Sequence, residues 1–260
     1  MIPRLAASVL VWAILVASTS AQAVAGQAPA AVTPPADSAE QVPSWGGMFG
    51  AIGRDFLRLP SRESAAILGV AGGLSLALRP LDERVTRNAA ASPALDHLFV
   101  AGAIGGGGLV QIGGALATYA LGRGTGHSGV AITGAELVRA QIVAGVLTQG
   151  LKVSVGRRRP DGGRFSFPSG HTSATFATAA VLQSRAGWRL GVPAYAFGVY
   201  VAGSRLQDNR HYLSDVIFGA GLGIVSGRAV AVGRGRGAGV VQPVVTPNAV
   251  GLMFSLREPR

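Results

Sequence analysis

The chain has 260 residues, of which 48% are hydrophobic and 13% charged, and it contains 39 glycines and no cysteine. This length accommodates one domain with a sizeable core, and the lack of cysteine excludes disulfide frameworks, thiolate metal sites and cysteine nucleophiles. A formal net charge of +11 can mark a protein that binds nucleic acid or an anionic surface. The basic residues lie mainly between apolar segments, however, without the interleaved aromatic side chains that stack on bases, so we do not expect nucleic-acid binding.

The first 25 residues have the pattern of an export signal. Arg4 precedes an apolar run over residues 5–19, and small residues follow where a signal peptidase could cut, after Ala23 or Ala25. An uncleaved membrane anchor is the alternative interpretation. Residues 26–44, rich in alanine and proline, are expected to form a flexible linker.

The remainder predicts an all-α protein, because apolar stretches alternate with short polar or glycine-rich breaks and no stretch shows the period-two alternation of a half-buried strand. We expect one helical domain over residues 45–232 and a tail over 233–260 that is extended or forms a small hairpin. The expected helices are 48–57, 62–78, 95–121, 131–153, 172–185, 191–206 and 211–231.

Some of these helices could cross a membrane, which takes about 20 apolar residues. The uncharged run 98–121 is long enough, whereas 131–151 contains Glu136 and Arg139. The stretch 65–78 is short, so we expect it to pack peripherally. These features favour a bundle embedded in a membrane, although short glycine-rich helices also fit a soluble helical protein.

Three clusters contain residue types suited to phosphate chemistry. The first is Lys152, followed after six residues by Arg159 and Pro160; the second is the sequence Pro-Ser-Gly-His at 168–171, just before an apolar run. Ser169 is placed as the N-cap of a helix whose free N–H groups can bind an anion. Taken separately, the first cluster is also typical of a solvated helix end, and the second of a capped helix with an incidental histidine.

The third cluster is Ser204-Arg205, then His211 and Asp215. His211 and Asp215 are four residues apart, so we expect them to share one face of a helix, where the carboxylate can hold the imidazole. A surface ion pair would have the same spacing. Together, however, the three clusters fix eleven residue types in a set order, and chance does not account for that combination.

The residue types predict how a phosphoryl group would be held. Lys152, Arg159 and Arg205 supply positive charge for the phosphoryl oxygens, and Ser169 and the Gly170 N–H can add donors. No further cluster of Asp, Glu and His has metal-ligand spacing, so we expect a mechanism without metal or other cofactor.

The combination K-x6-R-P, P-S-G-H and S-R-x5-H-x3-D resembles the signature of the type 2 phosphatidic acid phosphatase family, which bacterial nonspecific acid phosphatases and vanadium haloperoxidases share. The resemblance covers residues 152–215 and extends to the helical context from about 95 to 227. It implies a helical bundle with the active site at one end of the core helices. It also implies that His211 attacks phosphorus to form a phosphohistidine, that Asp215 fixes its tautomer, and that His171 protonates the leaving oxygen.

The implied function is metal-independent hydrolysis of phosphate monoesters or diphosphates, most of all of lipids. A soluble periplasmic acid phosphatase, a vanadium-dependent haloperoxidase and a non-catalytic anion-binding membrane protein remain alternatives. Membrane members of the family place these motifs on the outer face of the inner membrane, so we expect a periplasm-facing site. The expected partners are a phosphorylated substrate and the membrane, with no obligatory protein partner.

Overall fold

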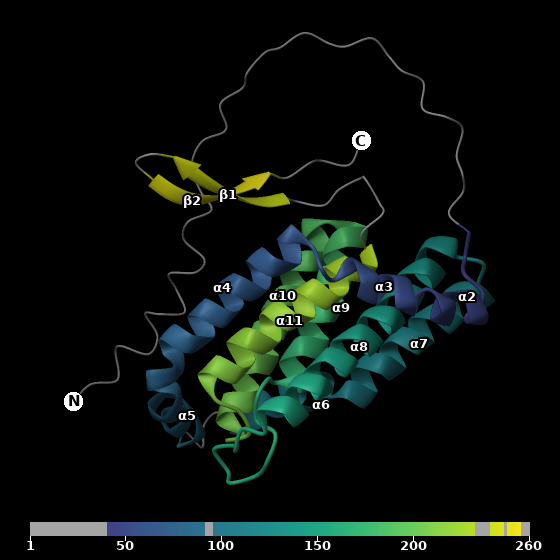
Figure 1. Ribbon diagram of the computed structural model, residues 1–260. Coiled ribbons are helices and arrows are strands. Elements are labelled where there is room, and N and C mark those ends of the chain that lie inside the picture. The colour runs from purple at the N-terminus through teal and green to yellow at the C-terminus, as the bar shows by residue number, and fades with distance from the viewer. Residues whose placement is uncertain (1–40, 92–95, 232–239, 247–248, 256–260) are drawn as a thin grey trace. The chain divides into compact units, whose positions relative to one another are not determined.

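The computed structural model describes residues 41–91, 96–231, 240–246 and 249–255, and over these ranges the chain forms a helical bundle and a two-stranded sheet (Figure 1). The expected leader, 1–25, and most of the expected linker lie outside the described residues. The prediction of an all-α bundle is confirmed. The helices are α2 (Trp45–Gly50), α3 (Ile52–Arg58), α4 (Arg62–Leu78), η1 (Arg79–Leu81), α5 (Asp82–Ala90), α6 (Asp96–Gly105), α7 (Gly108–Gly124), α8 (Ser128–Val155), α9 (Gly170–Ala186), α10 (Trp188–Gln207) and α11 (Leu213–Ala231).

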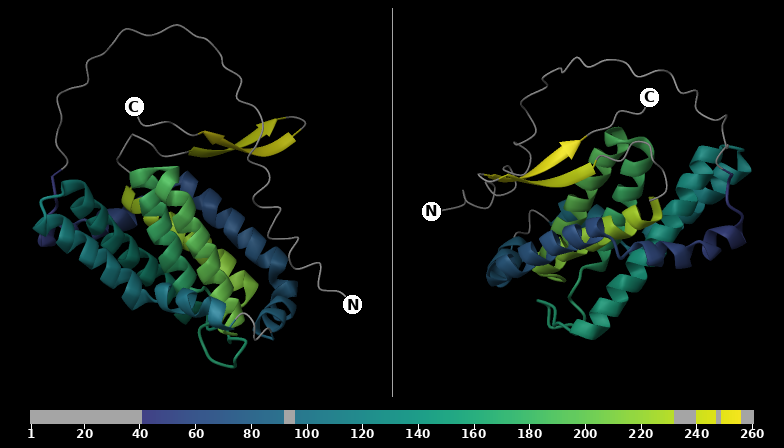
Figure 2. Two further views of the ribbon diagram at one scale, coloured as in Figure 1. Left: turned by 180° about the vertical axis from the view of Figure 1, so that it is seen from behind. Right: turned by 45° about the horizontal axis from the view of Figure 1, so that its top comes forward.

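Helix α9 lies at the centre of the bundle and packs against α8, α10 and α11, while α7 covers α8 and α4 covers α11 (Figure 2). Successive long helices run antiparallel. As a result, the C-terminal ends of α8 and α10 and the N-terminal ends of α9 and α11 meet at one end of the bundle. This is the end that bears all three sequence clusters.

Small residues let α9 and α11 approach closely. A Cβ atom added to Gly223 would lie 2.3 Å from the carbonyl oxygen of Ser173 and 2.8 Å from the Cβ of Phe176. One added to Gly227 would lie 2.6 Å from the carbonyl oxygen of Ala177. Glycine is therefore required on this face of α11 by contact with the neighbouring backbone.

The run 98–121, expected as one long helix, is instead two helices bent by 57° at residues 105–108. Consecutive glycines at this point weaken the helix, and Gly107 adopts an extended conformation with φ −62° and ψ 137°. The bend also lets α6 pack on α10, because a Cβ at Gly106 would lie 2.4 Å from Val201. The side-chain amide of Gln111 donates to the carbonyl oxygen of Gly105 at 2.7 Å. This bond satisfies a carbonyl oxygen that loses its helical partner at the break.

The segment after residue 78, for which no helix was expected, continues as η1 and α5. Polar residues dominate α5, so a search for apolar periodicity does not find it. Counted together, Arg62–Ala90 is one of three helical segments long and apolar enough to cross a membrane, with Ser128–Val155 and Leu213–Ala231; the bent pair α6–α7 would be a fourth. The stretch 65–78 is thus part of a longer candidate span than the sequence count indicated.

Helix α4 runs along α11 rather than across it. Near the C-terminal end of α4, the hydroxyl of Ser75 donates to the carbonyl oxygen of Ser214 at 2.9 Å. Two turns further from the site, Gly221 lies directly against Ala71. The C-terminal end of α4, and α5 after it, therefore reach the end of the bundle that bears the sequence clusters.

The expected extended tail is present as an antiparallel hairpin of β1 (Val240–Thr246) and β2 (Ala249–Ser255), with Val240 opposite Ser255. Valine-rich sequence favours strands, and Pro243 is tolerated because the hairpin has only two strands.

The glycine contact between α9 and α11 generates a stability prediction. Gly223→Ala should lower the free energy of unfolding by about 1–3 kcal/mol, because the new methyl group would overlap backbone atoms that cannot move freely. Gly145→Ala is the matched control, since a Cβ at Gly145 on α8 would meet nothing within 4 Å. Thermal unfolding in detergent should show this order, and equal melting temperatures would contradict the close packing.

Candidate active site

The first two clusters meet where α8 ends and α9 begins. Gly156 ends α8 in the left-handed conformation, with φ 60°, and its N–H donates to the carbonyl oxygen of Lys152. The Lys152 side chain is buried and donates to the carbonyl oxygen of Phe165 at 2.6 Å. A Cβ at Gly170, the first residue of α9, would lie 3.9 Å from Cε of Lys152, so the lysine lies against the N-terminus of α9.

Ser169 precedes α9 at the N-cap position, as expected, but its hydroxyl does not cap the helix backbone. The side chain of Thr172 donates to it at 3.0 Å instead. The N–H of Ser169 donates to the carbonyl oxygen of Asp215 at 3.0 Å, which joins the second cluster to the third. Ser169 and Asp215 are both fully buried.

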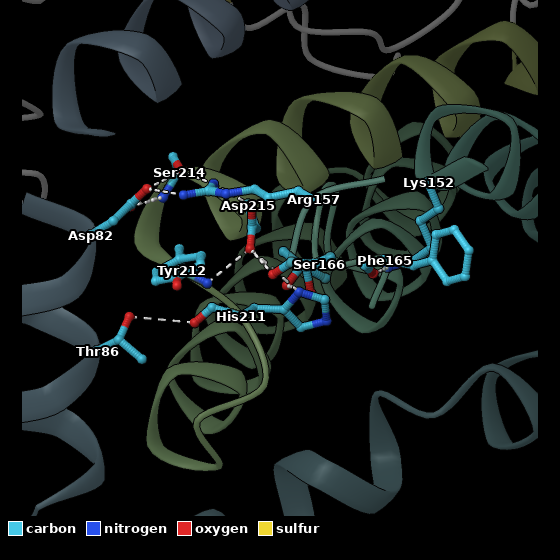
Figure 3. A network of polar contacts seen from close by, with 12 residues as sticks. Asp82, Thr86, Lys152, Arg157, Phe165, Ser166, His211, Tyr212, Ser214 and Asp215 are labelled. Carbon is cyan, nitrogen blue, oxygen red and sulfur yellow. Dashed lines mark hydrogen bonds and ion pairs between the residues drawn. The ribbon is translucent and has the colours of Figure 1, made fainter. Parts of the chain in front are cut away.

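His211 does not lie on a helix with Asp215, which corrects the expected geometry. It lies in the loop before α11, and only Asp215 is helical. Asp215 accepts a hydrogen bond from the N–H of Tyr212 at 2.9 Å, as the acidic third residue of a capping box does. The carboxylate therefore caps the start of α11 and also faces the histidine. Nδ1 of His211 is 3.7 Å from Oδ2 of Asp215, with no hydrogen-bond partner among the described residues (Figure 3).

The Asp215 carboxylate is held on both oxygens. Oδ2 also accepts a short hydrogen bond from the hydroxyl of Ser166, and Oδ1 accepts one from Arg157 at 2.7 Å. Three donors thus fix a carboxylate that is fully buried. A buried anion needs such partners, because without them its desolvation would favour the protonated form.

The arginines of the clusters supply positive charge around the two histidines. Arg205 is 6% exposed and bonds to Asp208 at 2.5 Å and to the hydroxyl of Ser204 at 3.2 Å. Nε of Arg159 is buried without a hydrogen-bond partner in the described structure. A buried guanidinium donor of this kind is suited to an anion. Within the described ranges, no three His, Asp or Glu side chains gather as metal ligands would.

Burial and the nearby cations act on both imidazoles. Burial, together with the charges of Arg205 and Lys152, lowers the pKa of His171 to about 4, against a hydrogen bond to the backbone of Ala103. Burial also lowers the pKa of His211, with Lys152 and Arg159 adding to the effect and Asp215 opposing it. Both rings are therefore neutral near pH 7 when no anion is bound, and the site as a whole attracts negative charge.

Three further residues of the site were not found from the sequence: Asp82, Arg157 and Ser166. Arg157 was not distinguished from the other basic residues that lie between apolar segments, and Asp82 lies in a segment for which no helix was expected. The sequence of the loop before α9 gave no reason to single out Ser166. These residues are recognised only from their contacts in space: Arg157 and Ser166 bond to Asp215, and Asp82 bonds to Arg157.

Residues 133–236, which include every residue of the three clusters, match the model of the PAP2 superfamily. Over this region the chain is similar to the PAP2 superfamily. Over 114 residues it is 36% identical to a lipid A 1-phosphatase of Porphyromonas gingivalis; this covers 40% of the chain and 25% of that protein, so the chain matches about a quarter of this relative's length.

Two solved structures share the fold. One is a transmembrane PAP2-type phosphatidylglycerolphosphate phosphatase from Bacillus subtilis, with a TM-score of 0.52 at 22% identity, covering 65% of this chain and 94% of that one. The other is LpxE of Aquifex aeolicus, with a TM-score of 0.50 at 23% identity, covering 58% of this chain and 94% of that one. The chain thus shares the helical fold of these two structures.

Proposed function

We propose that this protein is a membrane-bound phosphatase that hydrolyses the phosphate monoester or diphosphate of a lipid through a phosphohistidine intermediate. The observation on which the proposal chiefly depends is a pair of histidines, the buried His211 and the half-buried His171, among three cations at one end of the bundle. Asp215 lies behind His211 and leaves Nε2 as the nitrogen that can attack.

In the first half-reaction, Nε2 of His211 attacks phosphorus and the bond from phosphorus to the leaving oxygen breaks. Lys152, Arg159 and Arg205 stabilise the charge on the phosphoryl oxygens, and the N–H groups at the start of α9 add donors. Asp215 faces Nδ1, so it stabilises the imidazolium that forms as the N–P bond is made. His171 gives its proton to the leaving oxygen.

In the second half-reaction, His171 takes a proton from water as the water attacks phosphorus, and the P–N bond breaks to release phosphate and regenerate neutral His211. His171 is neutral in the free site, where its pKa is about 4, and the negative charge of the phosphoryl group on His211 favours its taking this proton. For the first half-reaction the negative charge of the bound phosphate must raise that pKa. Substrate and proton therefore enter together, and the substrate's own charge switches the residue from base to acid.

Exposed apolar surface supports a membrane location. Leu76 on α4, Leu109 on α7 and Val153 on α8 are 69%, 89% and 73% exposed. Large apolar side chains of this kind on several helices disfavour a soluble phosphatase. An apolar cavity of about 490 Å³ between α4 and α11, lined in part by Leu76, Phe167 and Phe218, reaches Arg157 at the edge of the site and could take an acyl chain.

The relatives support a lipid substrate. The curated relative acts on lipid A, and one of the structural neighbours on phosphatidylglycerolphosphate. Both substrates join a phosphate to a hydrophobic body. The same combination of cationic cradle and apolar helices in this chain favours that class of substrate.

The first prediction of this proposal is that phosphate release depends on His211 and not on a metal ion. The wild-type protein in detergent should release phosphate from a lipid phosphate or diphosphate in excess EDTA, and His211→Asn should lose at least about a thousandfold in kcat, because no group replaces the nucleophile. His127→Asn is the matched control, since His127 is exposed and its ring bonds to the hydroxyl of Thr125 at 2.9 Å. Full activity of His211→Asn would refute the mechanism.

If neither lipid nor soluble phosphate esters release phosphate, the phosphatase proposal fails. Halide oxidation with added vanadate then tests the remaining reaction for which this residue set is known.

A second prediction concerns the proton donor. His171→Asn should reduce kcat/KM for an alkyl phosphate by about 100-fold or more, but much less for p-nitrophenyl phosphate, whose leaving group needs no proton. The comparison is made within one variant, so a change in folding cancels. Equal losses on both substrates would mean that His171 does not protonate the leaving oxygen.

A third prediction concerns topology. Because α4 lies antiparallel along α11, a bundle that spans the membrane has α3 and the active site on opposite faces. We propose that the site faces the periplasm and α3 the cytoplasm, which replaces the expectation that 65–78 does not cross. This orientation also requires that residues 1–25 do not carry the chain into the periplasm, as the expected export signal would. The lack of native cysteine makes this measurable with single cysteines at two exposed positions, Arg54→Cys on α3 and Arg164→Cys beside the site.

A membrane-impermeant maleimide, applied to cells with a permeable outer membrane, should label Arg164→Cys at once and Arg54→Cys only after the inner membrane is lysed. Labelling of both without lysis would favour the soluble periplasmic alternative. The reverse pattern would place the site in the cytoplasm.

A further inference from the structure

Arg157 lies between two buried carboxylates, one from α5 and one from α11 (Figure 3). Its two terminal nitrogens are 2.7 Å from Oδ2 of Asp82 and 2.7 Å from Oδ1 of Asp215. The guanidinium also donates to the hydroxyl of Ser214 at 2.7 Å and lies 4.2 Å from the centroid of the Tyr212 ring. These contacts fix the plane of the guanidinium as well as its position.

Asp82 is itself held rigidly at the first residue of α5. It is 2% exposed, and its two oxygens accept the N–H of Ser214 at 2.8 Å and the hydroxyl of Ser214 at 2.5 Å. Its position near a helix N-terminus stabilises the carboxylate. Asp82 thus supplies Arg157 with a fixed second partner, so the arginine cannot swing away from Asp215.

The local chain conformation separates Arg157 from its two neighbours in sequence. After the left-handed turn at Gly156, the side chain of Arg157 points toward α11, Arg158 is exposed, and Arg159 belongs to the cationic cluster. The carbonyl oxygen of Arg157 accepts the N–H of Ser166 at 2.8 Å. Since Ser166 also donates to Asp215, two linked residues hold the carboxylate from two sides.

We propose that Arg157, anchored by Asp82, is the positioning residue for the nucleophile: it holds Oδ1 of Asp215 so that Oδ2 faces Nδ1 of His211. The inference rests on the proposed function, in which His211 attacks phosphorus. It extends the working site to α5, which contains none of the signature residues. Arg157 acts through Asp215 and touches no reacting atom.

The charges of the trio formed by Asp82, Arg157 and Asp215 predict a specific pH dependence. Two carboxylates against one guanidinium leave a net negative charge behind His211. Removing the cation makes this region more negative and favours the imidazolium, whereas neutralising Asp82 makes it less negative and favours the neutral ring. The two changes therefore shift the pKa of His211 in opposite directions. The other charged or titratable groups that act on the two histidines stay the same in every variant: Lys152, Arg159, His171 and Arg205.

The experiment compares Arg157→Met, Arg157→Lys and Asp82→Asn in the full-length protein in detergent, with His211→Asn as the inactive reference. Arg157→Met should lower kcat by about 10–100-fold, the usual cost of losing a partner that orients a reacting group, with KM changed less than about threefold. Arg157→Lys keeps the charge but cannot bridge both carboxylates, so its kcat should lie between those of Arg157→Met and wild type.

The pH dependence of kcat/KM separates positioning from a structural role. Because neutral His211 is the nucleophile, the acid limb reports its pKa in the free enzyme. The limb should move to higher pH in Arg157→Met and to lower pH in Asp82→Asn. Arg158→Met is the matched control: it removes the same charge from the neighbouring exposed residue and should match wild type in kcat and in pH profile.

The inference is overturned if Arg157→Met retains kcat within about twofold of wild type. It is also overturned if the acid limbs of Arg157→Met and Asp82→Asn stay at the wild-type pH, or move in the same direction, while only the melting temperature falls. Activity of the wild type and loss of it in His211→Asn decide the proposed function separately. If His211→Asn stays active, that function fails and the inference with it.

Discussion

The buried carboxylate of Asp215 is the group on which the rest of the site depends. Its side chain meets Ser166, Arg157 and the N–H of Tyr212, and its carbonyl oxygen accepts the N–H of Ser169. One residue thereby joins the loop after α8, the start of α9 and the start of α11. An anion with no exposed surface is stable only while all its donors are present, so the segments that supply them are fixed relative to one another.

The same residue shows how far sequence reasoning reaches. Cluster spacing identified Asp215 and paired it with His211, and the structure brings the two together. It does so by another route, because His211 is in a loop and the carboxylate closes that loop by accepting an N–H. Spacing of four residues indicates proximity in a helix, but a capping interaction at a helix start produces a similar proximity. Arg157 and Asp82 could not be predicted, because their partners are distant in sequence.

The helices were predicted most accurately where apolar periodicity is strong, and least accurately where glycines break a helix or polar residues form one. Helix α4 has its expected bounds of Arg62 and Leu78. The run 98–121 is apolar throughout, yet it breaks where consecutive glycines permit a bend and Val201 occupies the space that side chains would fill. Helix α5 is too polar for a periodicity search, although its first residue supports Arg157. In both cases a tertiary contact that is invisible in the sequence determines the local structure.

Rigid contacts behind His211, the proposed nucleophile, complement the positive charge in front of it. The trio of Asp82, Arg157 and Asp215 is negative and fully bonded, so it can stabilise an imidazolium without moving. The opposite side holds cations, among them Arg159, whose buried Nε has no partner among the residues that the structure describes. A bound phosphate would supply that partner and would also raise the pKa of His171 from about 4. The anion that is to be cleaved therefore completes the electrostatic balance of the site, so the proton needed by the leaving group is held only when a phosphate is present.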